Sequence, residues 1–551
     1  MHAIRLALTL LLVALPALAS AEIWLPQVFG DHMVLQREIA VPVWGTANPG
    51  EAITITFAGQ TQTTQAAADG AWSVPLAPLA ANAEPQTLTI ATPDGRKEFT
   101  DVLVGDVWLA SGQSNMDSPL GSMKTAVAVL EQANDPGLRF FKVTKGTAAE
   151  PQKDLKGQWQ PATPETARNF SAVAYLYAKE IRRTQNVPVA VLQSSWGGTP
   201  VKAWMSMESL QQAPKLENPL KEWDAAVTAH QKVVANPQLA AEYEAGLKRF
   251  LKEVYPAHSA ATKAYNAAVA AGTASGPKPE PASPEPVNPD PMGMPGPSKR
   301  PQTPTIIFNA NIRPLAPYAI RGVIWYQGEA DGGNGIAYRE LFPRLISGWR
   351  ALWGQGDFPF LFVQLPANQK DETPVATSGW PFLREAQLFT MQRTPNTGMA
   401  ITLDIGDPKD PHPQNKEFAA ARLALVGRKV AYGEQIVASG PLYAGHEISG
   451  SKVRLRFSET GGGLTIGQAP WVADGNTQLP ADKLVGFYVA GSDGKWFEAK
   501  AAIEGDSVIV SSPEVSAPAA VRYGWANSPR ANLYNREGLA ASPFRTDDWA
   551  R

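Results

Sequence analysis

The chain has 551 residues, with 49 Lys and Arg, 51 Asp and Glu, and no Cys. At roughly 150 residues per domain this length predicts about three or four domains, and a hydrophobic content of 44% with 18% charged residues is typical of globular proteins. A formal net charge of −2 without a sustained basic block argues against nucleic-acid binding, and the absence of cysteine excludes disulfide scaffolds, thiol nucleophiles and thiolate metal sites.

Residues 1–21 have the pattern of a secretory signal peptide. Arg5 supplies a short positive region, residues 6–18 are apolar but too few to span a bilayer comfortably, and Ala19-Ser-Ala21 resembles a cleavage site. No later stretch reaches about 18 uninterrupted apolar residues, so we expect no membrane anchor after cleavage near Ala21. The protein is therefore expected to be exported, either to the periplasm or to the medium.

The segment 22–100 is expected to form an N-terminal β-domain. Short runs that alternate apolar and polar residues, as at 53–57, are separated by turn signals such as Asp69-Gly70. This spacing indicates a small β-sandwich. Similar alternation returns over 436–551, which is expected to form a second, C-terminal β-domain.

Between these two segments, apolar strand-like runs alternate with helical stretches such as 338–352. This alternation predicts an α/β fold with a parallel sheet and crossover helices. Residues 101–215 and 305–435 carry the pattern, and residues 216–304 interrupt it with a predicted helical hairpin and a Pro-rich connector. Catalytic groups in such sheets collect beyond the carboxyl ends of the strands, so the functional site is expected at that edge.

Only one of the six histidines lies in the α/β part of the chain. His412 stands in Asp404-Ile-Gly-Asp-Pro-Lys-Asp-Pro-His-Pro413, just after the predicted strand 400–403. Hydrolytic chemistry near neutral pH usually needs a histidine as base. A structural loop histidine is the plainer interpretation for any single His, but the acidic neighbours and the place at a strand end favour a general base.

A candidate nucleophile follows another predicted strand. The run 107–110 leads into Ser111-Gly-Gln-Ser-Asn-Met116, which places Ser114 where its hydroxyl and nearby backbone N–H groups can meet a carbonyl. The second glycine of G-x-S-x-G is absent, so this is not the nucleophile elbow of the α/β-hydrolases. Many serines in such a pattern only cap a helix.

Two further strand-end loops offer groups that stabilise an oxyanion. Gly197 and Gly198 offer backbone N–H groups, and Gln327 in Trp325-Tyr-Gln-Gly-Glu329 offers a side-chain amide. Taken separately, a Gly-Gly pair is most simply a turn, and Gln327 is most simply a surface residue. Together with the serine and histidine loops, they supply what acyl transfer requires.

These motifs resemble those of the SGNH hydrolases, and specifically the bacterial sialate O-acetylesterase-like carbohydrate esterases. The resemblance covers most of the chain after residue 21, and the segments that carry it lie at 25–36, 112–116, 325–329, 410–416, 523–529 and 541–547. Residues 216–304 lie outside the resemblance. It implies an SGNH-type, flavodoxin-like three-layer catalytic domain between two β-sandwich-like domains, and an esterase that removes acetyl groups from sugars without a metal or organic cofactor.

The resemblance also implies roles for the candidate residues. Ser114 is the expected nucleophile, and His412 is the expected general base and then general acid. The N–H of Ser114, the N–H groups of Gly197 and Gly198, and the Gln327 side chain form the expected oxyanion hole. Gln327 stands where many of these enzymes have Asn.

The acid that orients His412 is open between two aspartates. In the broader superfamily it lies three residues before the histidine, and that position is Lys409 here. Asp410, two residues before His412, is the first choice, and Asp407, five residues before it, is the second. Backbone geometry, and not spacing alone, decides which carboxylate reaches Nδ1.

The implied partner is an O-acetylated carbohydrate, either a sialic acid ester or a plant cell-wall glycan such as xylan or xyloglucan. Trp196, Trp325 and Tyr326 lie close to the motifs and would line a pocket, although a role in the core fits them equally well.

Three other interpretations remain open. A glycoside hydrolase with two carboxylates would use, for example, Glu329 and Asp410. The cluster of Asp404, Asp407, Asp410 and His412 offers oxygen ligands to a divalent ion. A non-catalytic carbohydrate-binding protein would use some of the 16 tryptophans to stack on sugars.

Overall fold

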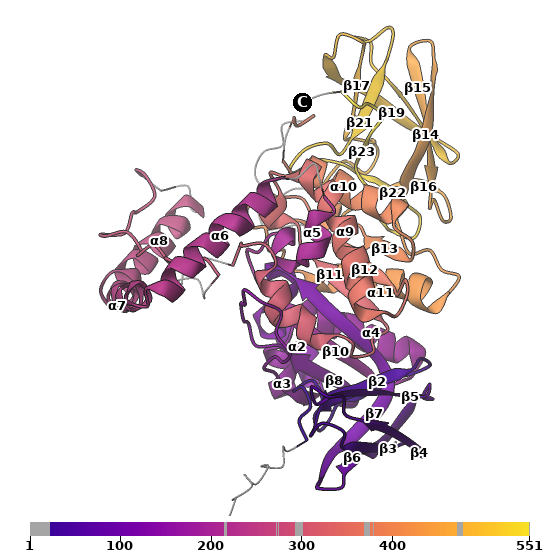
Figure 1. Ribbon diagram of the computed structural model, residues 1–551. Helices are drawn as coiled ribbons and strands as arrows, with labels where there is room; N and C mark the ends of the chain where they lie inside the picture. The colour runs from indigo at the N-terminus through magenta and orange to yellow at the C-terminus, as the bar shows by residue number, and fades with distance from the viewer. Residues whose placement is uncertain are drawn as a thin grey trace, which may run out of the picture.

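The computed structural model describes residues 23–213, 217–270, 273, 275–292, 301–368, 375–377, 379–470 and 478–549. The predicted signal peptide lies outside these ranges. None of the helices in these ranges combines the length and the hydrophobicity of a transmembrane segment. Figure 1 shows the N-terminal strands at the bottom, a sheet with helices in the middle, the C-terminal strands at the top, and the helices of residues 217–270 projecting at the left. The expectation of a mixed α/β protein with several sheets is confirmed.

The middle of the molecule is built on parallel strands. They lie in the order β13-β12-β11-β7-β10-β8, and the antiparallel β9 closes one edge. Every residue of β10, β11 and β12 is buried, as expected for strands that are covered on both faces. The strands are β7 (Gly95–Gly112), β8 (Asp135–Lys142), β9 (Trp159–Ala162), β10 (Val189–Ser195), β11 (Gly322–Tyr326), β12 (Phe360–Val363) and β13 (Thr397–Ala400).

Helices cover both faces of this sheet. Val107 and Leu109 of β7 belong to the buried cluster of α9 and α10, whereas Trp108 and Ala110 belong to that of α4 and α11. Successive side chains of a strand point to opposite faces, so the two clusters lie on the two sides of the sheet. The helices of this part are α1 (Ser114–Asp117), α2 (Ala126–Glu131), α3 (Pro164–Arg168), α4 (Ala172–Gln185), α5 (Met207–Gln211), α9 (Gly335–Trp353), α10 (Trp380–Arg393) and α11 (Lys416–Tyr432).

The order of the strands reverses direction at β7. From β7 the chain runs to β8 and β10 on one side, and it later returns to β11 on the other side. Loops that leave such a switch point diverge and open a crevice at the carboxyl ends of the strands, where ligands bind in open α/β sheets. The loops after β7, β10 and β11 therefore meet where the candidate residues were predicted.

Strand β7 also connects the parallel sheet to the N-terminal strands. Its first part pairs with β6 in an antiparallel ladder, and its residues 106–112 pair with β10. The predicted boundary at residue 100 therefore falls within one continuous strand. The N-terminal strands are β1 (Val34–Gln36), β2 (Val41–Thr46), β3 (Ala52–Phe57), β4 (Gln60–Gln65), β5 (Ala71–Leu76) and β6 (Asn82–Thr92).

A buried carboxylate fastens these two parts at β7. Asp106 is fully buried and accepts hydrogen bonds from Arg37 Nε at 2.9 Å, Arg321 Nε at 3.0 Å and the Tyr432 hydroxyl at 2.9 Å. Burial by itself raises the pKa of Asp106, but the hydrogen bond from Arg37 and the charges of both arginines lower it overall. Its contribution to stability is therefore complete at neutral pH and is lost as the pH falls through that lowered value.

The Asp106→Asn variant is expected to lose about 3–5 kcal/mol of unfolding free energy at neutral pH, because two partly buried arginines lose the counter-charge of a fully buried carboxylate. Urea denaturation of the variant and the wild type measures the difference. Asp94→Asn, in an exposed turn, is the matched control and is expected to unfold like the wild type. Equal stability of Asp106→Asn and the wild type would contradict this account of the cluster.

The segment predicted as a helical hairpin contains three helices in the structure. They are α6 (Glu217–Ala235), α7 (Gln238–Glu253) and α8 (Tyr255–Ala270). The hairpin prediction was wrong in the number of helices, because the chain breaks near both prolines. Pro237 separates α6 from α7, and Pro256 is the second residue of α8, a position where a proline costs a helix no hydrogen bond. In its described part, the Pro-rich stretch that follows forms neither helix nor strand.

The C-terminal strands form two four-stranded antiparallel sheets and one two-stranded ladder. The orders are β14-β15-β20-β19 and β18-β17-β21-β23, with β16 paired to β22. Alternate residues of both larger sheets share one buried cluster, so the two sheets pack face to face. The strands are β14 (Leu442–Ser449), β15 (Lys452–Ser458), β16 (Leu464–Ile466), β17 (Phe487–Ala490), β18 (Trp496–Glu498), β19 (Lys500–Glu504), β20 (Ser507–Ser511), β21 (Ala520–Tyr523), β22 (Leu533–Asn535) and β23 (Phe544–Arg545).

Candidate active site

Ser114 is the first residue of α1, two residues beyond the end of β7. Gly112 has a φ of +132°, and a Cβ atom there would lie 2.2 Å from the carbonyl oxygen of Tyr326, so only glycine fits. The Gln113 N–H donates to that same carbonyl at 2.9 Å. The turn into α1 is thereby fixed against the end of β11, with Ser114 at the carboxyl edge of the sheet.

The structure brings the predicted serine, histidine and aspartate together. His412 Nε2 lies 2.8 Å from Ser114 Oγ, and His412 Nδ1 lies 3.0 Å from Asp410 Oδ1. The side chains of His412 and Asp410 are 47% and 45% exposed, so the far end of this chain faces solvent. Both distances are within hydrogen-bond range, and each imidazole nitrogen has one partner.

The loop after β13 selects Asp410 from the aspartates near His412. Asp410 Oδ1 also accepts the backbone N–H of His412 at 2.8 Å, whereas Asp407 Oδ1 accepts the Lys409 N–H at 2.8 Å. Asp407 thus shapes the turn that presents Asp410. Asp404 is bound to the Arg422 guanidinium and to the Tyr534 hydroxyl, at 2.7 and 3.0 Å from its Oδ2.

The aspartates therefore do not form a single cluster around His412. Within the described ranges, no three His, Asp or Glu residues are placed to hold a metal ion together.

The glycine loop after β10 lies against the serine. A Cβ atom on Gly197 would come within 3.1 Å of the Ser114 Cβ, and the Trp196 N–H donates to the Gly112 carbonyl at 3.0 Å. Gly198 has a φ of +74°, which favours glycine. The first N–H groups of a helix have no acceptor within it, so the Ser114 N–H at the start of α1 is available to a ligand.

Gln327 is placed differently from the expected oxyanion donor. It is fully buried, and its amide nitrogen donates to the Thr199 carbonyl at 3.1 Å and to Asp331 Oδ2 at 2.6 Å. A primary amide has two N–H groups, so both are already used. Burial raises the pKa of Asp331 to about 6, against the opposing effect of the bonds from Gln327 and Val201. The Gln327 side chain therefore ties the glycine loop to the loop after β11.

A buried polar network beneath the serine was not predicted from the sequence. Asn115 is fully buried, and its amide donates to Glu329 Oε1 and to the carbonyl of Pro411, the latter at 2.9 Å. Its carbonyl oxygen accepts from Lys416 Nζ. Because Pro411 precedes His412, Asn115 links the serine loop to the histidine loop.

Burial shifts the two charged members of this network in opposite directions. It raises the pKa of the Glu329 carboxyl, although the bond from Asn115 and the charges of His412 and Lys416 oppose the shift. It lowers the pKa of Lys416 to about 8, although Glu329 and Asp410 favour the charged form. Each group thus needs the other as a counter-charge. Glu329 is only partly buried as a residue, but its Oε1 is held by Asn115 and its Oε2 is buried, so it is poorly placed as the second carboxylate of a glycosidase.

A cleft of about 740 Å³ opens beside the serine loop. Asp117, on the same helix as Ser114, lies in its wall and accepts hydrogen bonds from Lys145 Nζ at 2.6 Å and from the Ser195 hydroxyl at 3.0 Å. Lys142 and Lys156 also line it, so lysines outnumber carboxylates in this wall.

The aromatic residues near the motifs lie in the core. Trp325 and Tyr326 are 0% and 1% exposed, and Trp196 is 5% exposed. Trp325 packs among Trp204, Phe342 and Trp349. The structure therefore supports a role for these residues in the hydrophobic core and not in the lining of a pocket.

A serine, a histidine and an aspartate joined in this order, with backbone N–H groups beside the serine, are an arrangement typical of hydrolases that transfer acyl groups. A sequence model of the family "carbohydrate esterase, sialic acid-specific acetylesterase" matches residues 307–424. Sialate O-acetylesterase of Rattus norvegicus is 30% identical over 453 residues, which cover 75% of this chain and 74% of the relative. The Homo sapiens sialate O-acetylesterase is 29% identical over 450 residues, with 75% and 72% covered.

A solved structure agrees with these relatives. The crystal structure of a carbohydrate acetylesterase from Xanthomonas citri is 36% identical, with a TM-score of 0.75, and the match covers 96% of this chain and 100% of that one. The chain therefore belongs to the sialate O-acetylesterase family of carbohydrate esterases. It is a carboxylic ester hydrolase that acts on O-acetylated carbohydrate, which confirms the function inferred from the sequence.

Proposed function

We propose that the protein removes O-acetyl groups from sugars through an acetyl-serine intermediate on Ser114. The observation that carries this proposal is the unbroken chain from Asp410 through His412 to Ser114, with separations of 3.0 and 2.8 Å. Each link is at a distance that allows a proton to be held or moved without rearrangement. His412 is the base, and Asp410 holds its ring and stabilises the imidazolium.

The reaction follows from these positions. As Ser114 Oγ attacks the acetyl carbonyl carbon, its proton passes to His412 Nε2, and the carbonyl oxygen becomes an oxyanion. The tetrahedral intermediate collapses, the bond to the sugar oxygen breaks, and His412 returns the proton to that oxygen. Water then attacks the acetyl-serine, gives a proton to His412, and releases acetate as Ser114 recovers its proton.

The oxyanion is held by backbone groups in this proposal. The Ser114 N–H is at the start of α1, and the Gly197–Gly198 loop lies against Ser114, so their N–H groups are the candidate donors. Gln327 was predicted as a third donor, but its two N–H groups bind Thr199 and Asp331. We assign it a positioning role, because those bonds hold the glycine loop against the serine.

Gly197→Ala is expected to lower kcat for ester hydrolysis about 10²-fold, because the new methyl group pushes the loop away from Ser114 and displaces an oxyanion donor. Steady-state kinetics with 4-nitrophenyl acetate measure the change. Gly333→Ala is the control, since an added Cβ there meets no atom within 4 Å, and it is expected to keep the wild-type kcat. A Gly197→Ala enzyme with wild-type kcat would exclude this loop from the oxyanion hole.

We further propose that the α/β part is an SGNH-type, flavodoxin-like three-layer domain. The helices on both faces of the sheet and the switch point at β7 support this assignment. Residues 22–100 and 436–551 would form β-sandwich-like domains on either side. The signal-peptide pattern of residues 1–21 supports export to the periplasm or the medium.

The sugar is identified by a panel of substrates. The panel contains an O-acetylated sialic acid, the substrate in the names of the two relatives, and acetylated xylan and xyloglucan as neutral glycans. Acetate release from each glycan gives kcat/KM, and the highest value names the substrate class. If the enzyme hydrolysed 4-nitrophenyl acetate rapidly but released acetate from none of the acetylated glycans, the proposal that its substrate is an acetylated sugar would be contradicted.

A further inference from the structure

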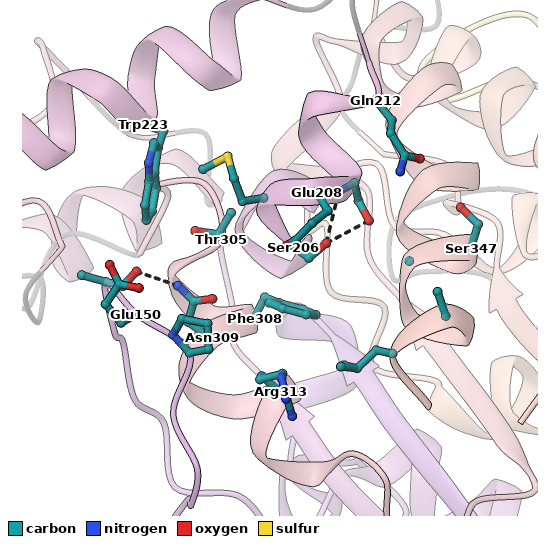
Figure 2. Close-up of a pocket in the computed structure, with 17 residues that line it drawn as sticks. Glu150, Ser206, Glu208, Gln212, Trp223, Thr305, Phe308, Asn309, Arg313 and Ser347 are labelled. Atoms are coloured by element: carbon teal, nitrogen blue, oxygen red, sulfur yellow. Dashed lines mark hydrogen bonds between the residues drawn. The ribbon is translucent and has the colours of Figure 1, made fainter. Parts of the chain in front are cut away.

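A second cavity lies at the base of the three projecting helices. It has a volume of about 660 Å³, within the range of sites that hold small organic ligands. Figure 2 shows Trp223 and Glu150 on one side of it and Gln212 and Ser347 on the other, with Thr305 and Phe308 between them. Helix α6 supplies Trp223, and α5 and α9 supply the opposite wall.

This cavity is separate from the catalytic serine. Helix α9 begins at Gly335, just after the carboxyl end of β11, and runs back along the sheet. Ser347, in the cavity wall, follows Gly335 by 12 residues. At a rise of about 1.5 Å per residue, the cavity lies about 18 Å along the helix from the catalytic edge.

The floor of the cavity contains a buried group without a partner. Thr305 is 1% exposed, and its hydroxyl makes no hydrogen bond in the described part of the protein. Its φ is +63°, a costly conformation for a β-branched residue. Phe308 begins a π-helix, η3 (Phe308–Ile312), a feature that is frequent at functional sites. An unpaired buried hydroxyl on strained backbone is expected where a ligand supplies the missing hydrogen bond.

The lining specifies the kind of ligand. Trp223 and Phe308 offer aromatic surface, and Glu150, Glu208, Gln212 and Arg313 offer hydrogen-bonding groups around it. Two carboxylates against one guanidinium disfavour an anionic ligand. An apolar ligand would strip water from these polar groups without replacing it. A molecule with hydroxyl groups around apolar C–H faces can hydrogen-bond to the polar groups and stack on the aromatic side chains.

We propose that this cavity is a second carbohydrate-binding site for an uncharged oligosaccharide, and that it holds the glycan whose acetyl groups are removed at Ser114. The choice of a glycan rests on the proposed function; the existence of a ligand site rests on the cavity and on Thr305. In this proposal the helical segment 217–270 contributes to glycan binding, because its Trp223 forms one wall of the site.

Isothermal titration calorimetry with xylohexaose and with a deacetylated xyloglucan oligosaccharide tests the proposal on the full-length protein. Neither probe carries an ester, so binding is measured whether or not the esterase mechanism is correct. Trp223→Ala and Arg313→Ala are each expected to weaken binding roughly tenfold or more. Both side chains are at least partly exposed, so both variants are expected to fold.

Leu220→Ala is the matched control. Leu220 lies one turn before Trp223 on α6 and packs against the core without lining the cavity, so its variant is expected to retain binding. Trp223→Ala is expected to hydrolyse 4-nitrophenyl acetate at the wild-type rate and to show a raised KM only on polymeric substrate. The proposal is overturned if neither oligosaccharide binds the wild type, if the Trp223 and Arg313 variants bind as the wild type does, or if Leu220→Ala loses as much affinity as Trp223→Ala.

Discussion

Ser114→Ala is expected to lower kcat for acetate release about 10⁶-fold, close to the effect of removing the whole nucleophile–base–acid set in other serine hydrolases. Without Oγ no acetyl-enzyme forms, and only the oxyanion donors and substrate binding remain to accelerate direct attack by water. The measurement is kcat on 4-nitrophenyl acetate and on the best glycan of the panel, with circular dichroism to show that the variant is folded.

Ser111→Ala is the control within the same motif. Ser111 is fully buried and its hydroxyl has no hydrogen-bond partner in the described ranges, so alanine replaces it without loss of an interaction. Its kcat is expected to stay close to that of the wild type. If Ser114→Ala instead kept the wild-type rate, Ser114 would not be the nucleophile, and another residue would have to carry the ester hydrolysis.

The second large effect separates the two aspartates. Asp410→Asn is expected to lower kcat between about 10²- and 10⁴-fold, because the imidazolium formed in the reaction loses its counter-charge and the ring loses its correct tautomer. Asp410 is 45% exposed, so water replaces part of its effect and the loss falls below that of a buried triad acid. The measurement is kcat as a function of pH.

Asp407→Asn gives the comparison for that prediction. Asp407 Oδ1 accepts the Lys409 N–H, and an asparagine oxygen accepts the same bond, so kcat is expected to change less than about tenfold. A greater loss in Asp407→Asn than in Asp410→Asn would make Asp407 the orienting acid during turnover. That outcome would mean that the loop rearranges when substrate binds.

Much of the site could be predicted from local patterns. Ser114 and His412 each follow an apolar run, and parallel strands bring their carboxyl ends to one edge of the sheet. The proximity of these loops therefore follows from the order and direction of the strands alone, without reference to side-chain contacts. The choice of Asp410 over Asp407 rested on spacing alone, and the geometry of the loop now supplies its physical reason.

Contacts between distant segments could not be predicted in this way. Asn115 meets Glu329 and Lys416 across 214 and 301 residues of sequence. Whether such side chains meet depends on strand register and rotamer, which no local periodicity encodes. Gln327 illustrates the same limit, because its motif suggested a donor to the substrate while Asp331 and Thr199 take both of its N–H groups.

Labelling with diisopropyl fluorophosphate tests the central claim most directly. The account predicts one adduct per chain, mapped by peptide mass spectrometry to Ser114, with esterase activity lost in proportion to labelling. His412→Ala is expected to slow the labelling strongly, because the serine loses its base. An adduct on another residue, or full esterase activity in protein labelled at Ser114, would contradict the assignment of Ser114 as the nucleophile.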